Sequence, residues 1–369
     1  MKPDTIEVRQ LRMRLCHPFE TSFGVTEERR VVLVTVREGS LAGWGEVTAA
    51  EGPFFSHESY ETAWHVLCDF IVPWSLGRDF ASPSDFPPVV ARIRGHRMAR
   101  AGLENALWDL AARQRNLPLW QMLGGRRREV ECGVSIGIQP SPEVLLEKIA
   151  EAVESGYRRV KIKVRPGWDA EILERVRREW PGLPLMADAN SAYTLGDTPL
   201  LRSLDAFGLM MLEQPLDWED IIDHATLQQE IETPICLDES IRSADDARKA
   251  SQIGACRIIN IKLGRVGGHT AARAVHDCSM ERGIPVWCGG MLETGIGRAH
   301  NVALSSLENF CLPGDVSASR RYWSEDIVEP EIEVTPEGTI LQSEAAGIGY
   351  RVREGLIEKL TERLRTFTP

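Results

Sequence analysis

The sequence predicts an α/β protein built as a (β/α)8-type barrel with an N-terminal α+β module that the C-terminal tail completes. From about residue 130 onward, short apolar runs that each end in a polar residue recur roughly every 25 residues, separated by helix-length segments. Such a repeat is typical of βα units, whose parallel strands are buried on both faces. Before residue 125, apolar residues instead alternate with polar ones, as they do in an antiparallel sheet. The active site of a barrel lies where its strands end, so the polar residues at those ends are candidates for function.

The first module, residues 1–125, is expected to combine a small sheet with helices. Alternating segments predict three strands, at residues 5–15, 31–36 and 43–48. The spacing of apolar side chains then predicts helices over 57–72 and 97–115, followed by a short helix between Pro118 and Gly125. Two expected loops, 18–24 and 51–57, carry four aromatic residues: Phe19, Phe23, Phe54 and Phe55. The family resemblance described below implies that they close over substrate, and packing within the module is the alternative.

The second module, residues 126–321, contains the repeats. We expect its strands at 130–136, 159–164, 184–188, 208–213, 234–238, 257–262 and 284–289, with a weak eighth near 310–312. We expect its helices at 142–156, 169–180, 218–231, 243–253, 268–282 and 296–307, with a short one near 197–205. The repeat ends near residue 322, and segment 322–369 is expected to return to the capping domain.

Composition excludes several classes of function. The chain has 369 residues and a net charge of −11 without a long Lys/Arg cluster, which argues against nucleic-acid binding. No apolar run approaches the roughly 18 residues that span a bilayer, and the start lacks the apolar core of a signal peptide, so a cytoplasmic protein is expected. The eight cysteines show neither a CxxC pair nor zinc-like spacing, which favours reduced thiols.

Three carboxylates, Asp188, Glu213 and Asp238, end consecutive predicted strands at a constant step of 25 residues. Three carboxylates directed at one volume cannot all remain ionised without a cation. Ligands that are all oxygens suit a hard ion, Mg²⁺ first and Mn²⁺ second. Each residue alone could instead cap the helix that follows its strand, but the shared step favours a metal site.

Lysines border this acidic trio on both sides. Lys163 ends the strand before Asp188, Lys262 ends the strand after Asp238, and Lys161 lies two residues before Lys163 on the same strand face. Burial or neighbouring cations would lower the pKa of such a lysine, so that it acts as a base near neutral pH. The arrangement suits removal of a proton alpha to a metal-neutralised carboxylate. A structural Lys–Asp pair inside the barrel is the alternative.

The ordered motifs resemble those of the enolase superfamily, muconate-lactonizing-enzyme subgroup: Lys161-x-Lys163, Asp188-x-Asn190, Glu213-Gln-Pro215, Asp238-Glu-Ser240 and Asn260-Ile-Lys262. The likeness covers nearly the whole chain, since the first module is similar to that family's capping domain. Four further segments resemble the o-succinylbenzoate synthase branch that also racemises N-succinylamino acids: residues 20–24, 133–140, 163–169 and 289–298.

The resemblance implies a role for each matching residue. Asp188, Glu213 and Asp238 would ligate Mg²⁺, Lys163 and Lys262 would be the acid/base pair on opposite faces of the substrate, and Lys161 would stabilise its carboxylate or enolate. The pocket for a small carboxylate substrate would be lined by Ser135, Asn190 and the backbone of Gly290, Met291 and Leu292, with Glu239 supporting the ligands. Homo-oligomers are also expected.

Differences from other groups of the superfamily reduce the number of activities that this sequence is expected to have. Residues 285–290 contain no histidine, unlike the corresponding strand of mandelate-racemase-like members, and Asp315 stands alone where dipeptide epimerases carry Asp-x-Asp. The resemblance favours the synthase reaction, a dehydration, together with racemisation of N-succinylamino acids in the same site; a dedicated racemase is the alternative that remains open. Dipeptide epimerase, muconate cycloisomerase and a non-catalytic binding protein on the same fold are the less favoured alternatives.

One hypothesis goes beyond the motifs. Arg265 follows Lys262 by three residues and would lower the pKa of that lysine by like-charge repulsion. The alternative is an arginine on the surface, in the loop before the next helix.

Overall fold

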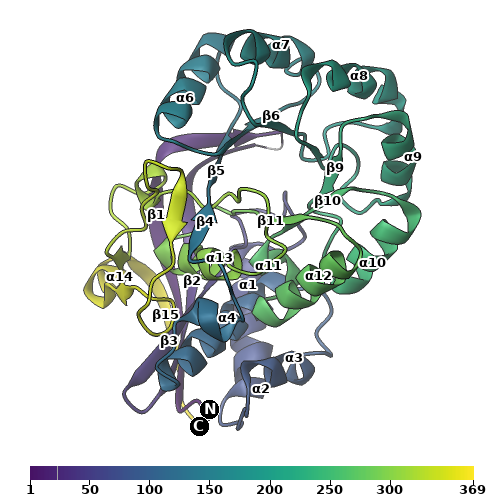
Figure 1. Cartoon of the computed structure of the whole chain (residues 1–369). Coiled ribbons are helices and arrows are strands. Elements are labelled where there is room, and N and C mark those ends of the chain that lie inside the picture. Colours follow the sequence, from purple (N-terminus) through teal and green to yellow (C-terminus); the bar gives the residue numbers. More distant parts are fainter. Residues whose placement is uncertain (23) are drawn as a thin grey trace.

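The computed structural model describes residues 1–22 and 24–369, and its centre is a curved parallel sheet. Seven strands follow one another in the order β11-β10-β9-β8-β7-β6-β5. Their bounds are β5 (Gly133–Ile136), β6 (Arg159–Lys163), β7 (Leu185–Asp188), β8 (Leu212–Glu213), β9 (Ile235–Leu237), β10 (Ile258–Ile261) and β11 (Val286–Cys288). Sequence order equals spatial order, as in a (β/α) barrel, and Figure 1 shows the helices in an arc outside the strands.

The eighth expected strand is reduced to isolated bridges. Phe310 bridges to Val286 and Gly314 to Cys132, so the segment between them still connects the two edges of the sheet. The Asp315 amide donates to the Cys288 carbonyl at 2.8 Å, and the Gly133 amide donates to the Gly314 carbonyl at 2.7 Å. Pro313 lacks the N–H that a continuous strand would need, which explains the interruption.

Helices cover the outside of this sheet close to the predicted positions. Their bounds are α6 (Pro142–Glu154), α7 (Ala170–Glu179), α8 (Thr198–Ser203), α9 (Ile222–Glu230), α10 (Ala244–Ile253), α11 (Leu263–Val266), α12 (His269–Glu281) and α13 (Gly295–Leu304). Helix α9 begins four residues later than expected because Asp217 and Asp220 fold the preceding segment into turns, accepting hydrogen bonds from the amides of Glu219 and Ile222 at 2.9 Å each.

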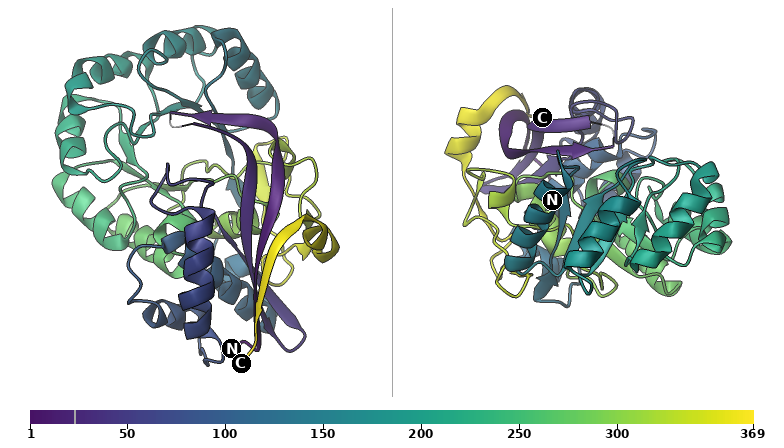
Figure 2. Two further views of the ribbon diagram at one scale, coloured as in Figure 1. Left: turned by 180° about the vertical axis from the view of Figure 1, so that it is seen from behind. Right: turned by 90° about the horizontal axis from the view of Figure 1, so that it is seen from above.

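The capping domain contains an antiparallel sheet in the order β15-β1-β2-β3. Its strands are β1 (Thr5–Thr21), β2 (Gly24–Glu38), β3 (Leu41–Val47) and β15 (Thr361–Phe367). Strand β15 comes from the C-terminus, follows α14 (Glu354–Leu360), and pairs with β1 from Ile6↔Phe367 onward. Figure 2 shows this yellow strand beside the purple hairpin, with both chain termini together at its end.

The expected loop at residues 18–24 is largely strand. Phe19 pairs with Thr26 and Thr21 with Gly24, beyond an irregularity between Arg14 and Phe19. Contacts with the barrel explain the extension, since the Ile138 amide donates to the Glu20 carbonyl at 3.0 Å and the Ser22 hydroxyl donates to the Asn190 carbonyl at 3.2 Å. The hairpin therefore reaches across the mouth of the barrel (Figure 2).

Helices of the cap pack against its sheet and against the barrel. They are α1 (Tyr60–Val66), a π-helical turn (Leu67–Ile71), α2 (Val72–Ser75), α3 (Phe86–Val89), α4 (Arg97–Gln114) and α5 (Leu119–Met122). Most of α4 is buried, and it approaches β3 closely at Gly45, where an added Cβ would lie 2.1 Å from the Gly102 carbonyl oxygen. Glycine at this position is required by the contact between helix and strand.

Buried carboxylates of the cap dock onto the N-termini of two barrel helices. Glu104 of α4 accepts from the His269 amide at 2.6 Å, where α12 begins, and Glu46 of β3 accepts from the Gly297 amide at 3.0 Å in the first turn of α13. Helix N-termini present N–H groups that have no partner within the helix, and these side-chain oxygens accept hydrogen bonds from them. The cap is thereby fixed over the strand ends.

The remaining paired segments are short: β4 (Glu129–Glu131) with β13 (Thr339–Leu341), and β12 (Val328–Glu329) with β14 (Arg351–Val352). The described part of the chain contains no helix long and apolar enough to cross a membrane. All eight cysteines are free thiols, and five of them are buried, including Cys236 and Cys288.

Candidate active site

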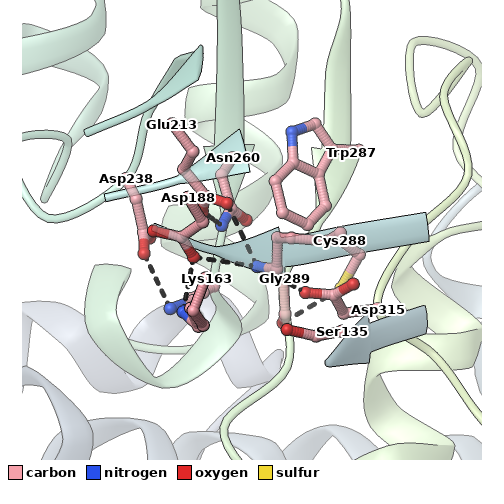
Figure 3. A network of polar contacts seen from close by, with 12 residues as sticks. Ser135, Lys163, Asp188, Glu213, Asp238, Asn260, Trp287, Cys288, Gly289 and Asp315 are labelled. Carbon is pink, nitrogen blue, oxygen red and sulfur yellow. Dashed lines mark hydrogen bonds and ion pairs between the residues drawn. The ribbon is translucent and has the colours of Figure 1, made fainter. Parts of the chain in front are cut away.

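The predicted ionisable residues meet at the C-terminal ends of the parallel strands. Lys163, Asp188 and Glu213 are the last residues of β6, β7 and β8, and lie side by side in the strand register. Asp238 and Lys262 follow the ends of β9 and β10. All five are buried, with at most 7 % of their surface exposed, and Figure 3 shows the carboxylates facing the amines.

Each carboxylate is held by an amine in this structure. Lys163 Nζ lies 2.5 Å from Asp188 Oδ2, and Lys262 Nζ lies 2.7 Å from Asp238 Oδ2. Lys161 Nζ lies between two carboxylates, 3.1 Å from Glu213 Oε2 and 3.2 Å from Asp188 Oδ2. The two outer lysines thus flank the acidic group from either side, and the charges balance within the buried site.

These neighbours shift the pKa values in ways that suit proton transfer. Burial lowers the pKa of Lys163 below its ordinary value, although Asp188 opposes the shift. Burial by itself would lower the pKa of Lys161. The negative charges of Asp315, Glu213 and Asp188 outweigh the effect of burial and hold the pKa of Lys161 well above its ordinary value. Lys163 is therefore the more easily deprotonated of the two, and Lys161 remains an ammonium.

The pKa values of the two neighbouring acids, Asp188 and Glu213, are shifted in opposite directions. Burial opposes ionisation of Asp188, but the ammonium groups of Lys163 and Lys161 prevail and its pKa lies below the ordinary range. Burial, and then the charge of Asp188, raises the pKa of Glu213. Two adjacent buried carboxylates therefore compete for the cations available, which is the condition that a divalent ion would relieve.

The donor set fits a hard divalent cation in its chemical type. Asp188, Glu213 and Asp238 supply only carboxylate oxygens from three adjacent strand ends. Among residues 1–22 and 24–369, no three acidic, histidine or cysteine side chains already surround a common metal position. The carboxylates are turned toward amines and, for Asp238, toward the Arg265 guanidinium. Binding of an ion would require these side chains to turn away from their present partners.

Asp315 is a member of the site that its isolated position in the sequence did not indicate. Its Oδ2 lies 2.7 Å from Lys161 Nζ, and its Oδ1 lies 2.7 Å from Arg159 Nη1. The Trp287 ring lies 4.9 Å from each of these cations. Figure 3 shows Trp287 and Asp315 in the same network. A signal was present, since two cations, Arg159 and Lys161, occupy one short apolar strand and need a buried anion.

A cavity of about 100 Å³ lies between the strand ends and the cap. All five predicted pocket residues line it: Ser135, Asn190, Gly290, Met291 and Leu292. The cap contributes Phe19 and Phe55, and the Phe55 ring lies 4.3 Å from Lys262 Nζ. Phe54 is 70 % exposed and does not line the cavity, and Phe23 lies outside the described residues.

Left-handed backbone at four non-glycine positions shapes the loops of the site: Asn190, Ser191, Gln214 and Leu292, with φ of 42°, 62°, 37° and 60°. Such conformations cost energy and are held by surrounding contacts. Gln214 Oε1 accepts from the Asp238 amide at 3.0 Å, and Glu293 Oε1 accepts from the Met291 amide at 2.9 Å. Both residues lie in motifs that carry the family resemblance, but the sequence did not indicate this supporting role for either.

Comparison with known protein families gives a match for each of the two modules. Residues 5–124 match the mandelate racemase / muconate lactonizing enzyme N-terminal domain, and residues 144–356 match the enolase C-terminal domain-like family. The chain belongs to the enolase superfamily. Its capping domain and its barrel are thus both accounted for by one family.

Relatives within the enolase superfamily cover almost the entire chain. An o-succinylbenzoate synthase from Geobacillus kaustophilus is 52% identical over 98% of this chain and 96% of the relative. An N-succinylamino acid racemase from Thermus thermophilus is 45% identical over 98% of both chains. A crystal structure of an enolase-superfamily protein from Listeria innocua, 38% identical, superposes with a TM-score of 0.95 over 100% of this chain and 99% of that one.

Two further predicted residues of this superfamily member lie beside the acids. The Asn190 side-chain amide donates to Glu239 Oε1 at 3.1 Å, so Glu239 contacts the residue that also binds Lys163. Arg265 is buried rather than on the surface, so that alternative is wrong. Its guanidinium contacts Asp238 and donates to the Ile241 carbonyl at 2.8 Å, and burial lowers its pKa to about 9. Its repulsion of Lys262 stays a prediction.

Proposed function

We propose that this protein is an o-succinylbenzoate synthase that also racemises N-succinylamino acids. The synthase reaction is the syn dehydration of 2-succinyl-6-hydroxy-2,4-cyclohexadiene-1-carboxylate. Relatives named for each activity match nearly the whole chain at 52% and 45% identity. The observation that supports the proposal best is the pair of buried amines, Lys163 and Lys262, on either side of three carboxylates at a cavity between barrel and cap.

Asp188, Glu213 and Asp238 would hold Mg²⁺, with Mn²⁺ as the second choice. The bound ion would supply positive charge that neutralises the substrate carboxylate and the negative charge developing on its oxygens. Family membership supports dependence on a divalent metal in general, and the choice of magnesium rests on the all-oxygen donor set.

For dehydration, Lys163 is the base. Its neutral amine removes the proton alpha to the carboxylate, and burial, by lowering the pKa of Lys163, makes that neutral form more accessible. The resulting ammonium then gives the same proton to the departing hydroxyl, so that the C–O bond breaks, a C=C bond forms and water leaves. Lys262 remains an ammonium on the opposite face and stabilises the negative charge, as Lys161 does from its position beside Asp315.

For racemisation, the two lysines exchange roles across one carbon. One amine removes the alpha proton from its face of the N-acylamino acid, and the ammonium of the other delivers a proton from the opposite face. Protons and charge balance after each turnover. The same pair of amines therefore supports both reactions, and the cap residues Phe19 and Phe55 keep bulk water from the intermediate.

The test measures both reactions on one preparation with Mg²⁺. Formation of the aromatic product is followed by its ultraviolet absorbance, and alpha-proton exchange of N-succinylamino acids is followed by proton NMR in D₂O. Both activities are expected. A dedicated N-succinylamino acid racemase is the second candidate, because two relatives with that name are 45% and 44% identical; exchange without aromatisation would select it. Activity confined to dipeptides, or no activity at all, would reject both.

The remaining expectations concern partners and location. We propose a small-molecule carboxylate as the only ligand besides the metal, no nucleic acid, a cytoplasmic location and a homo-oligomer. Light scattering after size-exclusion chromatography measures the assembly directly, and a mass equal to one chain would reject the oligomer.

A further inference from the structure

Arg29 of β2 is a cation of the cap that lines the same cavity as the lysines. Only 3 % of its surface is exposed. Its Nη2 donates to the Ala49 and Thr48 carbonyls at 3.0 Å and 3.3 Å, and its Nη1 donates to the Met291 carbonyl at 3.2 Å. The guanidinium is therefore held rigidly between the end of β3 and the loop after β11.

The charge of Arg29 has no partner of opposite sign within ion-pair distance among the described residues. The other three cations of the cavity, Lys161, Lys163 and Lys262, are each paired with a carboxylate. Arg29 instead contacts neutral carbonyl groups, and its Nε has no hydrogen-bond partner in the described part of the chain.

The nearest acids are engaged elsewhere. Glu51 pairs with Arg30 at 2.8 Å, Glu46 accepts hydrogen bonds at the start of α13, and Glu293 accepts from the Met291 amide and from Asn301 at 2.9 Å each. These carboxylates influence Arg29 only through space. A buried cation without a counter-ion is costly, and burial accordingly lowers the pKa of Arg29. Beside a ligand cavity, an anionic group of the ligand would remove this cost.

We propose that Arg29 is the counter-ion of a second carboxylate, carried by the acyl end of the substrate. The cavity would then select dicarboxylates: one carboxylate binds among the acids and lysines of the barrel, and the other lies against the cap arginine. The inference rests on the proposed function and deepens it, because o-succinylbenzoate precursors and N-succinylamino acids share a terminal carboxylate. Monocarboxylates such as N-acetylamino acids lack this second charge.

The competing explanation is that Arg29 only ties the cap to the loop at Met291. That role would affect all substrates equally, whereas a counter-ion distinguishes substrates by charge. Racemisation is therefore compared for one amino acid with three acyl groups: succinyl, its neutral amide analogue succinamoyl, and acetyl. Arg29→Met removes the charge, Arg29→Lys keeps it, and Arg30→Met is the matched control, since Arg30 is on the same strand, pairs with Glu51 and does not line the cavity.

The wild type is expected to prefer succinyl over succinamoyl by about 30-fold or more in kcat/KM, the size associated with a buried charge pair. Arg29→Met should lose this preference mainly through a higher KM for the succinyl substrate, with succinamoyl and acetyl substrates little changed. Arg29→Lys should retain part of the preference, and Arg30→Met all of it.

Equal losses of kcat/KM on all three substrates, or no loss on any, would overturn the proposal. If Arg29→Met does not fold, the test relies on the wild type and on Arg29→Lys. A wild-type ratio of kcat/KM for the succinyl substrate to kcat/KM for the succinamoyl substrate near one refutes a carboxylate subsite. If the wild type neither aromatises nor exchanges protons, the proposed function fails separately. Calorimetric binding of o-succinylbenzoate against its neutral side-chain amide would then still test Arg29, with equal affinities rejecting it.

Discussion

Removing the negative charge of Asp315 tests whether the buried cations of the barrel need this carboxylate as their counter-ion. It is buried, with 7 % of its surface exposed, and it accepts ion pairs at 2.7 Å from both Arg159 and Lys161. In Asp315→Asn the side chain keeps its shape but loses its charge, and its NH₂ group faces a donor. Breaking a buried pair in this way costs about 3–5 kcal/mol, because uncompensated cations remain buried.

That cost translates into a measurable change in melting temperature. An unfolding entropy of about 2.1 cal/mol/K per residue gives roughly 0.8 kcal/mol/K for a chain of 369 residues. The melting temperature of Asp315→Asn is therefore expected to fall by about 4–6 °C at pH 7. Differential scanning calorimetry measures the shift. The matched control is Glu308→Gln, which removes an exposed pair with Arg126 and is expected to change the free energy of unfolding by less than about 0.5 kcal/mol.

The pH dependence of the free energy of unfolding provides an independent check that ionised Asp315 stabilises the folded protein. Burial opposes ionisation of Asp315, but Lys161 and Arg159 hold its pKa below the ordinary range. The stabilisation is therefore complete above the unfolded pKa of about 4 and is lost as the pH falls toward the folded pKa. The difference between wild type and Asp315→Asn should shrink below about pH 4. A difference under 1 kcal/mol at pH 7, or one that grows on acidification, would refute this account of the pair.

Three further predictions address the amines, the acids and the cap. Lys163→Ala and Lys262→Ala should each abolish racemisation, while exchange in D₂O persists for the one enantiomer whose proton faces the remaining lysine; NMR exchange of both enantiomers in either variant would contradict a two-base site. Chelation by EDTA should abolish both activities and lower the melting temperature. Added Mg²⁺ should restore the activities and, because it binds the folded state, the melting temperature. Full activity after exhaustive chelation would exclude a required metal. Burial raises the pKa of Glu46 to about 8 despite its hydrogen bonds to Thr294 and Gly297. The stability linked to its proton is therefore fully present below the unfolded pKa of about 4.3 and is lost progressively as the pH rises to the folded pKa. Glu46→Gln should therefore gain stability relative to wild type between pH 6 and pH 9, and a constant difference in calorimetry would contradict the shift.

The strand ends were predictable because their physical signal is strong. A lysine or an acid closing an apolar strand is rare enough that five at a regular step indicate one site, and Lys163 and Asp188 lie in register as the spacing required. The capping sheet was predictable for the same reason, since alternation of side chains defines which face is buried. The extension of β1 through Phe19 was not, because the contacts that stabilise it come from the barrel.

Residues that support the site could not be recognised from local patterns. Gln214, Glu293 and Asp315 act through single hydrogen bonds or ion pairs to residues distant along the chain or in strained loops. Nothing in an isolated stretch distinguishes a buried Glu293 from an exposed one. The burial of Arg265 was equally hidden, since its counter-ion Asp238 lies on the preceding βα unit.

The distribution of charge suggests how chemistry and selectivity are divided between the two modules. Every amine and acid proposed to move protons or bind metal lies on a barrel strand end, where the rigid sheet holds it. Arg29, for which the described residues provide no counter-ion, lies on the cap and reaches the cavity together with Phe19 and Phe55. The cap is itself anchored by Glu46 and Glu104 at the starts of barrel helices, so its residues keep a defined position over the strand ends. Changes in the cap can therefore alter which acyl group is accepted without disturbing the amines. Because the two proposed reactions share these amines, one site is expected to carry out both dehydration and racemisation.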